Sequence, residues 1–599
     1  MKPFFRALGA LALLCAYASA EIPDSTHPDY DLRVVAMPLQ FKTMGLAFLP
    51  DGSLALATTD AVGGGEVPDP SPEHKVYLLR GASPDSLPSL LREISHGWKQ
   101  ISGIVAVGER IYVADRDGFY AIVDNNPAGD LDSNRKLIVK WPVSTRWNFG
   151  PFWHQWCFTP LYRDGYFYAP YSGSILTGGW SNVEATTPLS GAFLKWDLQG
   201  NLSAFAGGLR SPNGAALDPA TGEMFVTDNQ GSWLPSSTFM RMRPDRFYGH
   251  RQTPTDLDSN GLVVGTHAPN FAEAYPYEPP VAWLPHGTVR SSPSQPAKLP
   301  TGPFAGDWVI GDVNNPGLVR VYLDRVGDAL NGAVFWFTKG MGYAAVNRIV
   351  PGPDGALWLG TLTTIGGNWP SGEKKPFYRL TAKEQGGAFD IRAVRSMDDG
   401  LEIDFTQPVN PDSIGPEHFT VQSWQYIRQR EYGVGKQPTE TRAVTAAEAS
   451  KDRKRVHLKI PGLTIDRVIH IQAERLASSG GMALWNDEAW FTLNALSDRV
   501  WDKNAPTVAI GTAHTPVAKA RVAWIARGGA LEVSLACGTG ACTGARFTAA
   551  LYAPDGSRLA QAAGEDALRM PLPHGSGVGL LRVESPVLGN SQVTYKIAF

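Results

Sequence analysis

The sequence predicts an all-β protein: a six-bladed β-propeller followed by two small β-sandwich domains. Turn-forming residues are plentiful, with 63 Gly and 46 Pro among 599 residues, and 18 Trp add aromatic bulk. Pairs of short apolar strands recur along the chain, whereas no long amphipathic helical pattern follows the first residues. The net charge of −3 gives no reason to expect nucleic acid as a partner.

Residues 1–20, "MKPFFRALGALALLCAYASA", predict a signal peptide. Lys2 and Arg6 precede an apolar run, and small residues at its end allow cleavage after Ala20. The residues before Cys15 form a poor lipid-attachment box, so we expect no lipid anchor. No later segment stays apolar for about 20 residues, so we expect no membrane span and a periplasmic, secreted or cell-surface bacterial protein.

A hairpin motif repeats across residues 21–385 and predicts the propeller. Each copy has an apolar strand, a turn and a second apolar strand. The copies read "GLAFLPDGSLALAT", "GIVAVGERIYVADRDG", "CFTPLYRDGYFYAPYSG", "NGAALDPATGEMFVTDNQG", "GDWVIGDVNNPGLVRVYLD" and "NRIVPGPDGALWLGT". The first four lie about 55 residues apart, in the range of propeller repeats. An irregular β-sandwich is the alternative, but it does not explain why the turns recur at similar intervals.

Two further β domains follow the repeats. Residues 386–497 alternate apolar and polar residues, which predicts an immunoglobulin-like sandwich. Residues 505–599 predict a second sandwich, which is similar to the sorting or attachment domains at the end of some secreted bacterial proteins. Its Cys537 and Cys542 are close enough in sequence for a local disulfide after export.

Residues 40–365 resemble the glucose/sorbosone dehydrogenase family, soluble quinoproteins built on a six-bladed propeller. The resemblance rests on "GLAFLPDG", "WHQWCFTPLYRDGYFYAP", "GLRSPNGAALDPATGEMFVTDNQG" and "PDGALWLGT". It implies an oxidoreductase that oxidises a sugar or alcohol hydroxyl with pyrroloquinoline quinone (PQQ) as hydride acceptor. A calcium ion would polarise the quinone, and a separate protein could accept the electrons.

The resemblance assigns roles to four residues. His154 would be the general base and Arg210 the clamp on the quinone, while the carbonyls of Gly231 and Ser232 would hold the calcium. Each catalytic assignment has a structural alternative. His154 could be a core histidine among aromatic side chains, and Arg210 could be an arginine between blades that backbone carbonyls satisfy. The functional reading requires His154 and Arg210 to share a pocket.

The sequence also departs from the family at cofactor-binding positions. Asn314 stands near the place of a quinone-binding lysine, and Ala345 and Asn347 stand near two late arginines, with Lys339 and Arg348 off register. A quinone with three carboxylates would be poorly neutralised there, because burying unpaired carboxylates is costly.

A second calcium site is suggested by "DLDSNG". Asp256, Asp258 and Asn260 have the spacing of the first oxygen ligands of a calcium loop, with Gly at the sixth position. His267 occupies position 12, where a bidentate acid would stand. An ordinary Asx-rich turn is the alternative.

The sequence therefore leaves two functions open. The first is the exported quinoprotein oxidoreductase, acting on a small sugar. The second is a non-catalytic propeller that binds polysaccharide or a cell-surface partner. Aromatic residues between the hairpin copies could stack on sugar rings, or simply fill the wedges between blades. They are Trp153, Trp156, Tyr171, Trp180, Trp233 and Trp283, with His286 nearby.

Overall fold

The chain divides into two compact units, Met1–Val508 and Ala509–Phe599, and both are built from β-strands. The computed structural model describes residues 26–39, 41–59, 74–142, 156–173, 189–251, 255–257, 263–266, 271–315, 317–339, 345–362, 377–505, 521–527, 530–537, 540–541, 546–552, 558–565, 567–571, 578–584 and 592–598. Several sequence predictions lie outside these ranges: the signal peptide (1–20), His154, Asp258 and Asn260.

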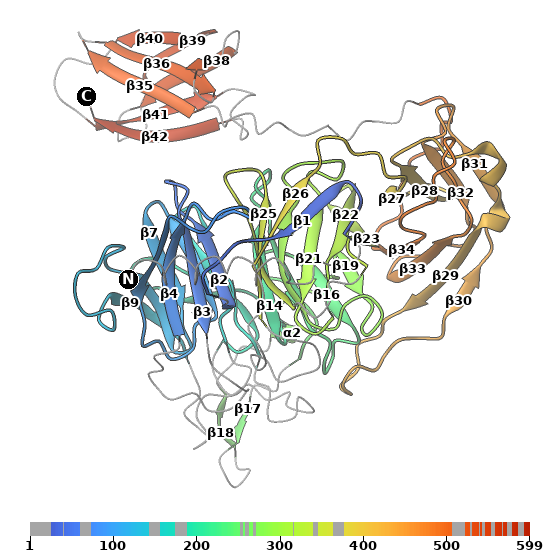
Figure 1. Cartoon of the computed structure of the whole chain (residues 1–599), viewed down its shortest axis with the longest axis horizontal. Coiled ribbons are helices and arrows are strands. Elements are labelled where there is room, and N and C mark those ends of the chain that lie inside the picture. Colours follow the sequence, from blue (N-terminus) through green and yellow to red (C-terminus); the bar gives the residue numbers. More distant parts are fainter. Residues whose placement is uncertain are drawn as a thin grey trace, which may run out of the picture. The chain divides into compact units, whose positions relative to one another are not determined.

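Within the described residues from Tyr30 to Ala382, the strands form six successive antiparallel groups of four, which we number in chain order as sheets 1 to 6 (Figure 1). Sheet 1 contains β2 (Lys42–Phe48), β3 (Leu54–Thr59), β4 (His74–Arg80) and β5 (Leu90–Ser95). Sheet 2 contains β6 (Gly103–Val107), β7 (Arg110–Ala114), β8 (Gly118–Ile122) and β9 (Arg135–Lys140). Sheet 3 contains β10 (Leu161–Arg163), β11 (Tyr166–Pro170), β12 (Ala192–Trp196) and β13 (Ser203–Gly207).

Sheets 4 to 6 follow the same plan. Sheet 4 contains β14 (Pro212–Leu217), β15 (Met224–Asp228), β16 (Ser237–Met242) and β19 (Ala282–Leu284). Between its last two strands lie the pair β17 (Thr255–Leu257) and β18 (Val263–Thr266) and the short helix α2 (Phe271–Ala274). Sheet 5 contains β20 (Pro293–Lys298), β21 (Trp308–Asp312), β22 (Val319–Val326) and β23 (Ala329–Trp336). Sheet 6 contains β24 (Val346–Pro351), β25 (Leu357–Thr361), β26 (Tyr378–Ala382) and the N-terminal strand β1 (Tyr30–Val34).

The first strands of the sheets lie next to one another. β2 contacts both β6 and β24, β10 contacts β6 and β14, and β20 contacts β14 and β24. The approach is close enough to require glycine in two of the repeats. A Cβ on Gly45 would lie 2.3 Å from Ile104, and one on Gly214 would lie 2.2 Å from the backbone of Gln295. The Gly in "MGLAF" and "PNGAAL" is therefore explained by packing between sheets.

Arg348 joins four sheets at, or directly before, their first strands. It belongs to β24 in sheet 6 and is 1% exposed. Its Nε donates a 2.8 Å hydrogen bond to the carbonyl of Met44, and its Nη2 donates one of 2.8 Å to the carbonyl of Ser102. Its Nη1 donates to the carbonyl of Asn213 at 3.1 Å. These acceptors belong to the first strand of sheet 1, the segment entering sheet 2 and the first strand of sheet 4, so one guanidinium ties them together.

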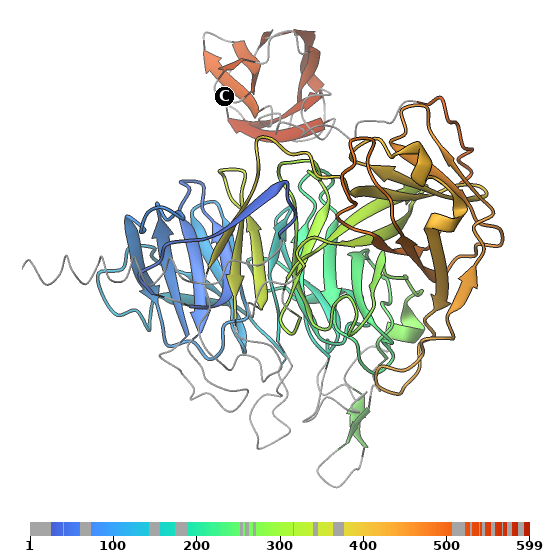
Figure 2. The same ribbon diagram turned by 45° about the vertical axis from the view of Figure 1, so that its right-hand side comes forward.

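Sheet 5 continues directly into the region after the repeats. β23 pairs with β34, with Ala333 opposite Phe491, and the combined sheet has the order β20-β21-β22-β23-β34-β33-β29-β30. Figure 2 shows these strands running on from the green of sheet 5 to the gold and brown of the later residues. The added strands are β29 (Phe419–Gln425), β30 (Glu440–Arg442), β33 (Arg467–Ala473) and β34 (Glu488–Leu493).

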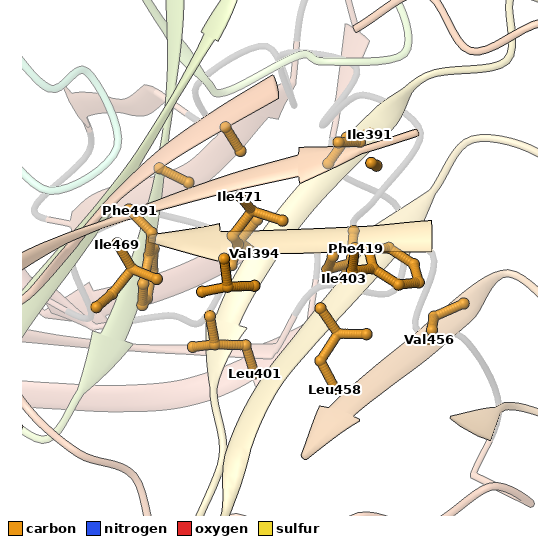
Figure 3. Close-up of a cluster of buried hydrophobic side chains, with 14 of the residues drawn as sticks. Ile391, Val394, Leu401, Ile403, Phe419, Val456, Leu458, Ile469, Ile471 and Phe491 are labelled. Atoms are coloured by element: carbon orange, nitrogen blue, oxygen red, sulfur yellow. The ribbon is translucent and has the colours of Figure 1, made fainter. Parts of the chain in front are cut away.

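A second sheet packs on these added strands and encloses a core. It has the order β27-β28-β32-β31 and is joined to β29 through two short 3-10 turns. Figure 3 shows Val394 and Leu401 from this sheet near Ile469 and Phe491 from the other. The bounds are β27 (Ile391–Ser396), β28 (Gly400–Phe405), η1 (Pro411–Ser413), η2 (Pro416–His418), β31 (Ala446–Ala449) and β32 (Arg455–Lys459).

The unit from Ala509 to Phe599 also contains two sheets. In one, β36 (Ala530–Cys537) pairs with β35 (Arg521–Arg527), β37 (Gly540–Ala541) and β40 (Ala567–Pro571). The other has the order β39 (Arg558–Glu565), β38 (Arg546–Tyr552), β41 (Val578–Glu584), β42 (Gln592–Ala598). Cys542 lies outside the described residues, so its disulfide with Cys537 stays a prediction.

Candidate functional site

Buried aspartates at the ends of second strands position the segments that enter sheets 4 and 5. Asp228, the last residue of β15, accepts hydrogen bonds of 2.7 Å from the N–H groups of residues 210 and 211. Asp312, the last residue of β21, accepts bonds of 2.7 and 2.9 Å from those of residues 291 and 292. Burial raises the pKa of Asp228 to about 6, although these N–H groups act in the opposite direction.

The Arg210 side chain lies under Tyr432, which comes from the region after the repeats. The residue is 6% exposed, and its guanidinium lies 5.0 Å from the centre of the Tyr432 ring and hydrogen-bonds to that side chain. Burial lowers the pKa of Arg210, and both Tyr432 and Asp228 oppose this effect. A Cβ on Gly231 would lie 1.9 Å from Nε of Arg210. Arg210 and Gly231 therefore adjoin.

The two carbonyls predicted to hold calcium already accept hydrogen bonds. That of Gly231 accepts from the N–H groups of Gly433 and Leu234, both at 3.2 Å. That of Ser232 lies 2.9 Å from Nδ1 of His250, which must carry the proton because a carbonyl only accepts. In this arrangement the residues do not fit a calcium-bound quinone, because calcium would compete with these donors and Tyr432 covers the guanidinium.

His250 is a buried histidine that sequence reasoning missed. It is 2% exposed, its Nδ1–H is oriented by the Ser232 carbonyl, and its Nε2 has no hydrogen-bond partner among the described residues. Burial lowers its pKa to about 4, and the charge of Arg210 acts in the same direction, so the imidazole is neutral near pH 7. Its only sequence signal is its place in "RFYGHRQTP", shortly after the third strand of sheet 4.

Trp233 is held in a conformation that bulky residues rarely adopt. Its φ is 65°, in the left-handed region. Its N–H donates a 2.7 Å hydrogen bond to the carbonyl of Gln429, and the guanidinium of Arg251 lies 5.3 Å from the centre of its ring. The ring is partly exposed. Strained residues of this kind concentrate at binding and catalytic sites.

The segment that joins β29 to β30 covers this region, and we call residues 426–439 the cover loop. Gln429, Tyr432 and Gly433 contact sheet 4 and its entering segment as described above, and Tyr426 also packs against Trp283. The cover loop is anchored further by Arg428, whose guanidinium lies 3.4 Å from the centre of the Tyr277 ring. The sequence "WQYIRQREYG" (residues 424–433) therefore ends β29 and begins a loop that reaches sheet 4. Arg210, Gly231, Trp233, His250 and Tyr432 together form what we call the Arg210 cluster.

The remaining predicted residues are dispersed. Asn314 is exposed, and its N–H donates to Asp312 at 2.6 Å. Asp256 lies in β17, opposite Gly265 of β18. His286 lies next to sheet 4 and is exposed overall; partial desolvation of its ring lowers its pKa, while Asp312 acts to raise it. Because His154 lies outside the described residues, a shared pocket with Arg210 stays a prediction.

Several aromatic and cysteine side chains in and beside sheets 3 and 4 are buried in contacts with neighbouring residues. Cys157 is fully buried, which raises its pKa well above its ordinary value. Trp156 donates from Nε1 to Gln100 at 3.0 Å, between sheets 2 and 3. Trp283 packs against Tyr426 of the cover loop. In the described part of the chain, no group of three or more His, Cys, Asp or Glu side chains is placed to hold a metal ion.

Comparisons with known proteins give low similarities. No family model and no curated protein matches the chain. Among solved structures, it is similar to a Thermus thermophilus protein provisionally assigned as an oxidoreductase (glucose dehydrogenase). The identity is 17% and the TM-score 0.40, over 59% of this chain and 100% of that one. It is also similar to the WD40 β-propeller domain of Doa1, at 8% identity and TM-score 0.28, over 59% of this chain and 97% of that one.

A third similar structure is the extracellular domain of a B. thetaiotaomicron protein assigned as a one-component system. The identity is 9% and the TM-score 0.20, over 93% of this chain and 85% of that domain. Among the residues that the structure describes, no helix combines the length and apolarity needed to cross a bilayer. The function proposed below rests on the chain's own residues, because these similarities are too low to carry it.

Proposed function

We propose that this chain is an exported, six-bladed propeller that binds carbohydrate at the Arg210 cluster. One observation carries the proposal: Trp233 is fixed in a strained conformation with its ring partly exposed, beside the guanidinium of Arg251. Tyr432, 36% exposed, adds a second aromatic ring over Arg210. Aromatic faces next to hydrogen-bond donors are the groups that stack on and orient sugar rings.

The six-bladed ring is part of this proposal. It is supported by the contacts between successive first strands, which return from β24 to β2. It is also supported by β1, which pairs with β26 so that the start and the end of the repeat region share sheet 6. A shared sheet of this kind is how propellers protect their edges.

A saccharide panel tests the binding function. We expect the intact protein to bind at least one polysaccharide in isothermal titration calorimetry, and Trp233→Ala to weaken that binding about tenfold or more, because a stacked aromatic contributes roughly 1–1.5 kcal/mol or more. The matched control is Tyr166→Ala, which removes an exposed ring beside Lys195 in sheet 3. Equal affinities in all three proteins would overturn the proposal.

The quinoprotein oxidoreductase is the second candidate. The observation in its favour is that Arg210 and Gly231 adjoin, with the unpartnered Nε2 of His250 close by in the described structure. A neutral imidazole whose Nδ1–H is fixed can accept a hydroxyl proton at Nε2. For this function the cover loop would have to withdraw Tyr432 from Arg210. The chain would then contribute Arg210 to orient a bound group and His250 to remove the proton.

Dye reduction with a sugar panel tests this second candidate. PQQ and calcium are added to the wild type, to Tyr432→Ala, which uncovers Arg210, and to His250→Gln. Activity in Tyr432→Ala that depends on His250 would support the oxidoreductase. The absence of quinone absorbance and of activity in both wild type and Tyr432→Ala would eliminate it.

A further inference from the structure

Arg290 occupies a place in sheet 5 that a core residue fills in sheet 4. Asp228 caps the N–H groups of residues 210 and 211, and Asp312 caps those of residues 291 and 292. The residue directly before each capped pair is Leu209 in sheet 4 and Arg290 in sheet 5. Leu209 is fully buried and Arg290 is 1% exposed. A guanidinium thus stands where the fold itself needs only an apolar side chain.

One edge of this guanidinium has no partner within the described residues. Both Nε and Nη2 of Arg290 are buried there without any hydrogen bond. These two N–H groups point from the same edge of the planar group, which is the edge that binds a carboxylate through two parallel hydrogen bonds. Leaving them unpaired is costly in a protein interior. The Nε–H and Nη2–H groups of Arg290 are therefore suited to bind an oxyanion.

The nearby Asp312 cannot be that oxyanion, because its oxygens are already used. Oδ2 accepts from residues 291 and 292, and Oδ1 accepts from residues 314 and 315 at 2.6 and 2.8 Å. The negative charge of Asp312 acts to raise the pKa of Arg290. Burial has the larger effect and lowers this pKa to about 10. With this carboxylate close by, a ligand of one negative charge is better tolerated than a phosphate dianion.

A glycine and an aromatic ring border the guanidinium, and its segment leads to the surface. Gly317, at φ 108°, borders the unpartnered edge without a side chain, and a Cβ there would lie 3.8 Å from Nη2. The ring of Trp336, half-buried, lies 5.9 Å from Cζ of Arg290. Ser291 is half-buried and Asn314 exposed, so the segment reaches the surface within a few residues of the guanidinium.

Arg290 is also linked to the Arg210 cluster. The hydroxyl of Ser237 accepts from the N–H of Gln230 at 3.3 Å and donates to the carbonyl of Ser291 at 3.2 Å. Gln230 directly precedes Gly231 of the Arg210 cluster. The Ser237 hydroxyl therefore connects the cluster to the segment that carries Arg290.

We infer that the Nε–Nη2 edge of Arg290 receives a carboxylate of the ligand, and that the ligand is a uronic acid-type sugar. The sugar part of this inference rests on the proposed function, whereas the carboxylate part rests on Arg290 alone. Binding forms two charge-assisted hydrogen bonds and neutralises a buried cation.

Calorimetric titration with glucuronate, glucose, acetate and inorganic phosphate tests the inference. The variants are Arg290→Leu, which copies the residue of sheet 4, and Arg290→Lys, which keeps the charge but loses the planar fork. The control is Arg80→Leu, an exposed arginine paired with Asp51 in sheet 1. We expect glucuronate to bind wild type and Arg80→Leu more tightly than glucose does. Both Arg290 variants should lose roughly 10- to 100-fold in affinity.

The outcomes separate the two proposals. Unchanged glucuronate binding in Arg290→Leu, or tighter binding of phosphate than of glucuronate, would overturn the inference. Polysaccharide binding that needs Trp233 but not Arg290 would also overturn it and leave the proposed function standing. Acetate and glucuronate binding that needs Arg290, without any polysaccharide binding, would support the carboxylate site and reject the carbohydrate function. Circular dichroism melts of each variant confirm that it is folded.

Discussion

Arg348 and Arg210 are both buried arginines, but their guanidinium groups contact different kinds of partner. The hydrogen bonds of Arg348 end on main-chain or amide oxygens, and burial alone lowers its pKa to about 9. Arg348 is thus a guanidinium between sheets that oxygen acceptors satisfy. Arg210 contacts a tyrosine from another part of the chain.

Replacing Arg348 should therefore lower stability more than replacing an exposed arginine does. Arg348→Met leaves the carbonyls of Met44, Ser102 and Asn213 without this donor, which should reduce the free energy of unfolding by about 3–5 kcal/mol. Urea unfolding, followed by tryptophan fluorescence, measures this change in the free energy of unfolding. The matched control is Arg33→Met, because Arg33 is exposed and paired with the exposed Asp85. A loss below about 0.5 kcal/mol in Arg348→Met would contradict this role.

His250 should make stability fall as the solution is acidified. Its pKa is about 4 in the folded chain and 6.5 when unperturbed, so between these values the unfolded chain binds the additional proton. The stability that its neutral form provides is complete above pH 6.5 and is lost as pH falls toward 4, by up to about 3 kcal/mol. His250→Gln lacks this titration. The difference in unfolding free energy between wild type and His250→Gln, measured from pH 7 to pH 4.5, should therefore shrink with acidity, and a constant difference would contradict the assignment.

At the level of residues, the sequence relates groups that are close in the chain but does not reveal partners that are distant in it. "GLRSPNG" and "NQGSW" are close in sequence and belong to one hairpin, so Arg210 and Gly231 could be expected together. Tyr432 lies more than two hundred positions from Arg210 in the chain, and no periodicity connects them. His250 and Arg290 stand out only by their missing hydrogen bonds within the described structure, which sequence does not display.

At the level of elements, the pairing of β23 with β34 makes sheet 5 part of the sandwich. Ala333 and Phe335 of β23 are buried in the same core as Ile391 and Phe491. Strand positions inside each region followed from alternation of apolar residues. The pairing of β23 with β34 could not be predicted in this way. Either strand could have been a solvent-exposed edge strand with the same sequence pattern.

This shared core predicts different effects for two truncations. A chain ending at Ala388 would lose β34, exposing the edge of β23 and the ring of Phe335, so we expect aggregation or a cooperative melt at least several degrees lower. A chain ending at Val508 keeps this core whole and should melt like the first unit of the full chain. Calorimetry of the two truncated chains and of the full chain measures their melting temperatures. Equal melting of the two truncated chains would show that the sandwich contributes nothing to sheet 5.

For the whole molecule, the sequence indicated the repeats and the all-β class because hairpins with Gly-rich turns recur at regular spacing. Five of the six groups of strands begin close to the copies identified there, whereas the fifth copy, from Gly306, covers β21 and β22 because sheet 5 already begins with β20 at Pro293. The cover loop could not be anticipated, since its target is formed only when the repeats and the later region have both folded. The candidate site is therefore a product of two regions that sequence reading treats separately.

The placement of β1 affects how the chain reaches its native state. The strand made first, beginning at Tyr30, finds its partner β26 only after the other five sheets have been synthesised. Contacts so far apart in sequence slow folding, and an unpaired strand invites association with other chains meanwhile. Refolding should accordingly end with a slow step in which the N-terminal segment docks, and newly made chains would benefit from a factor that shields this strand until then.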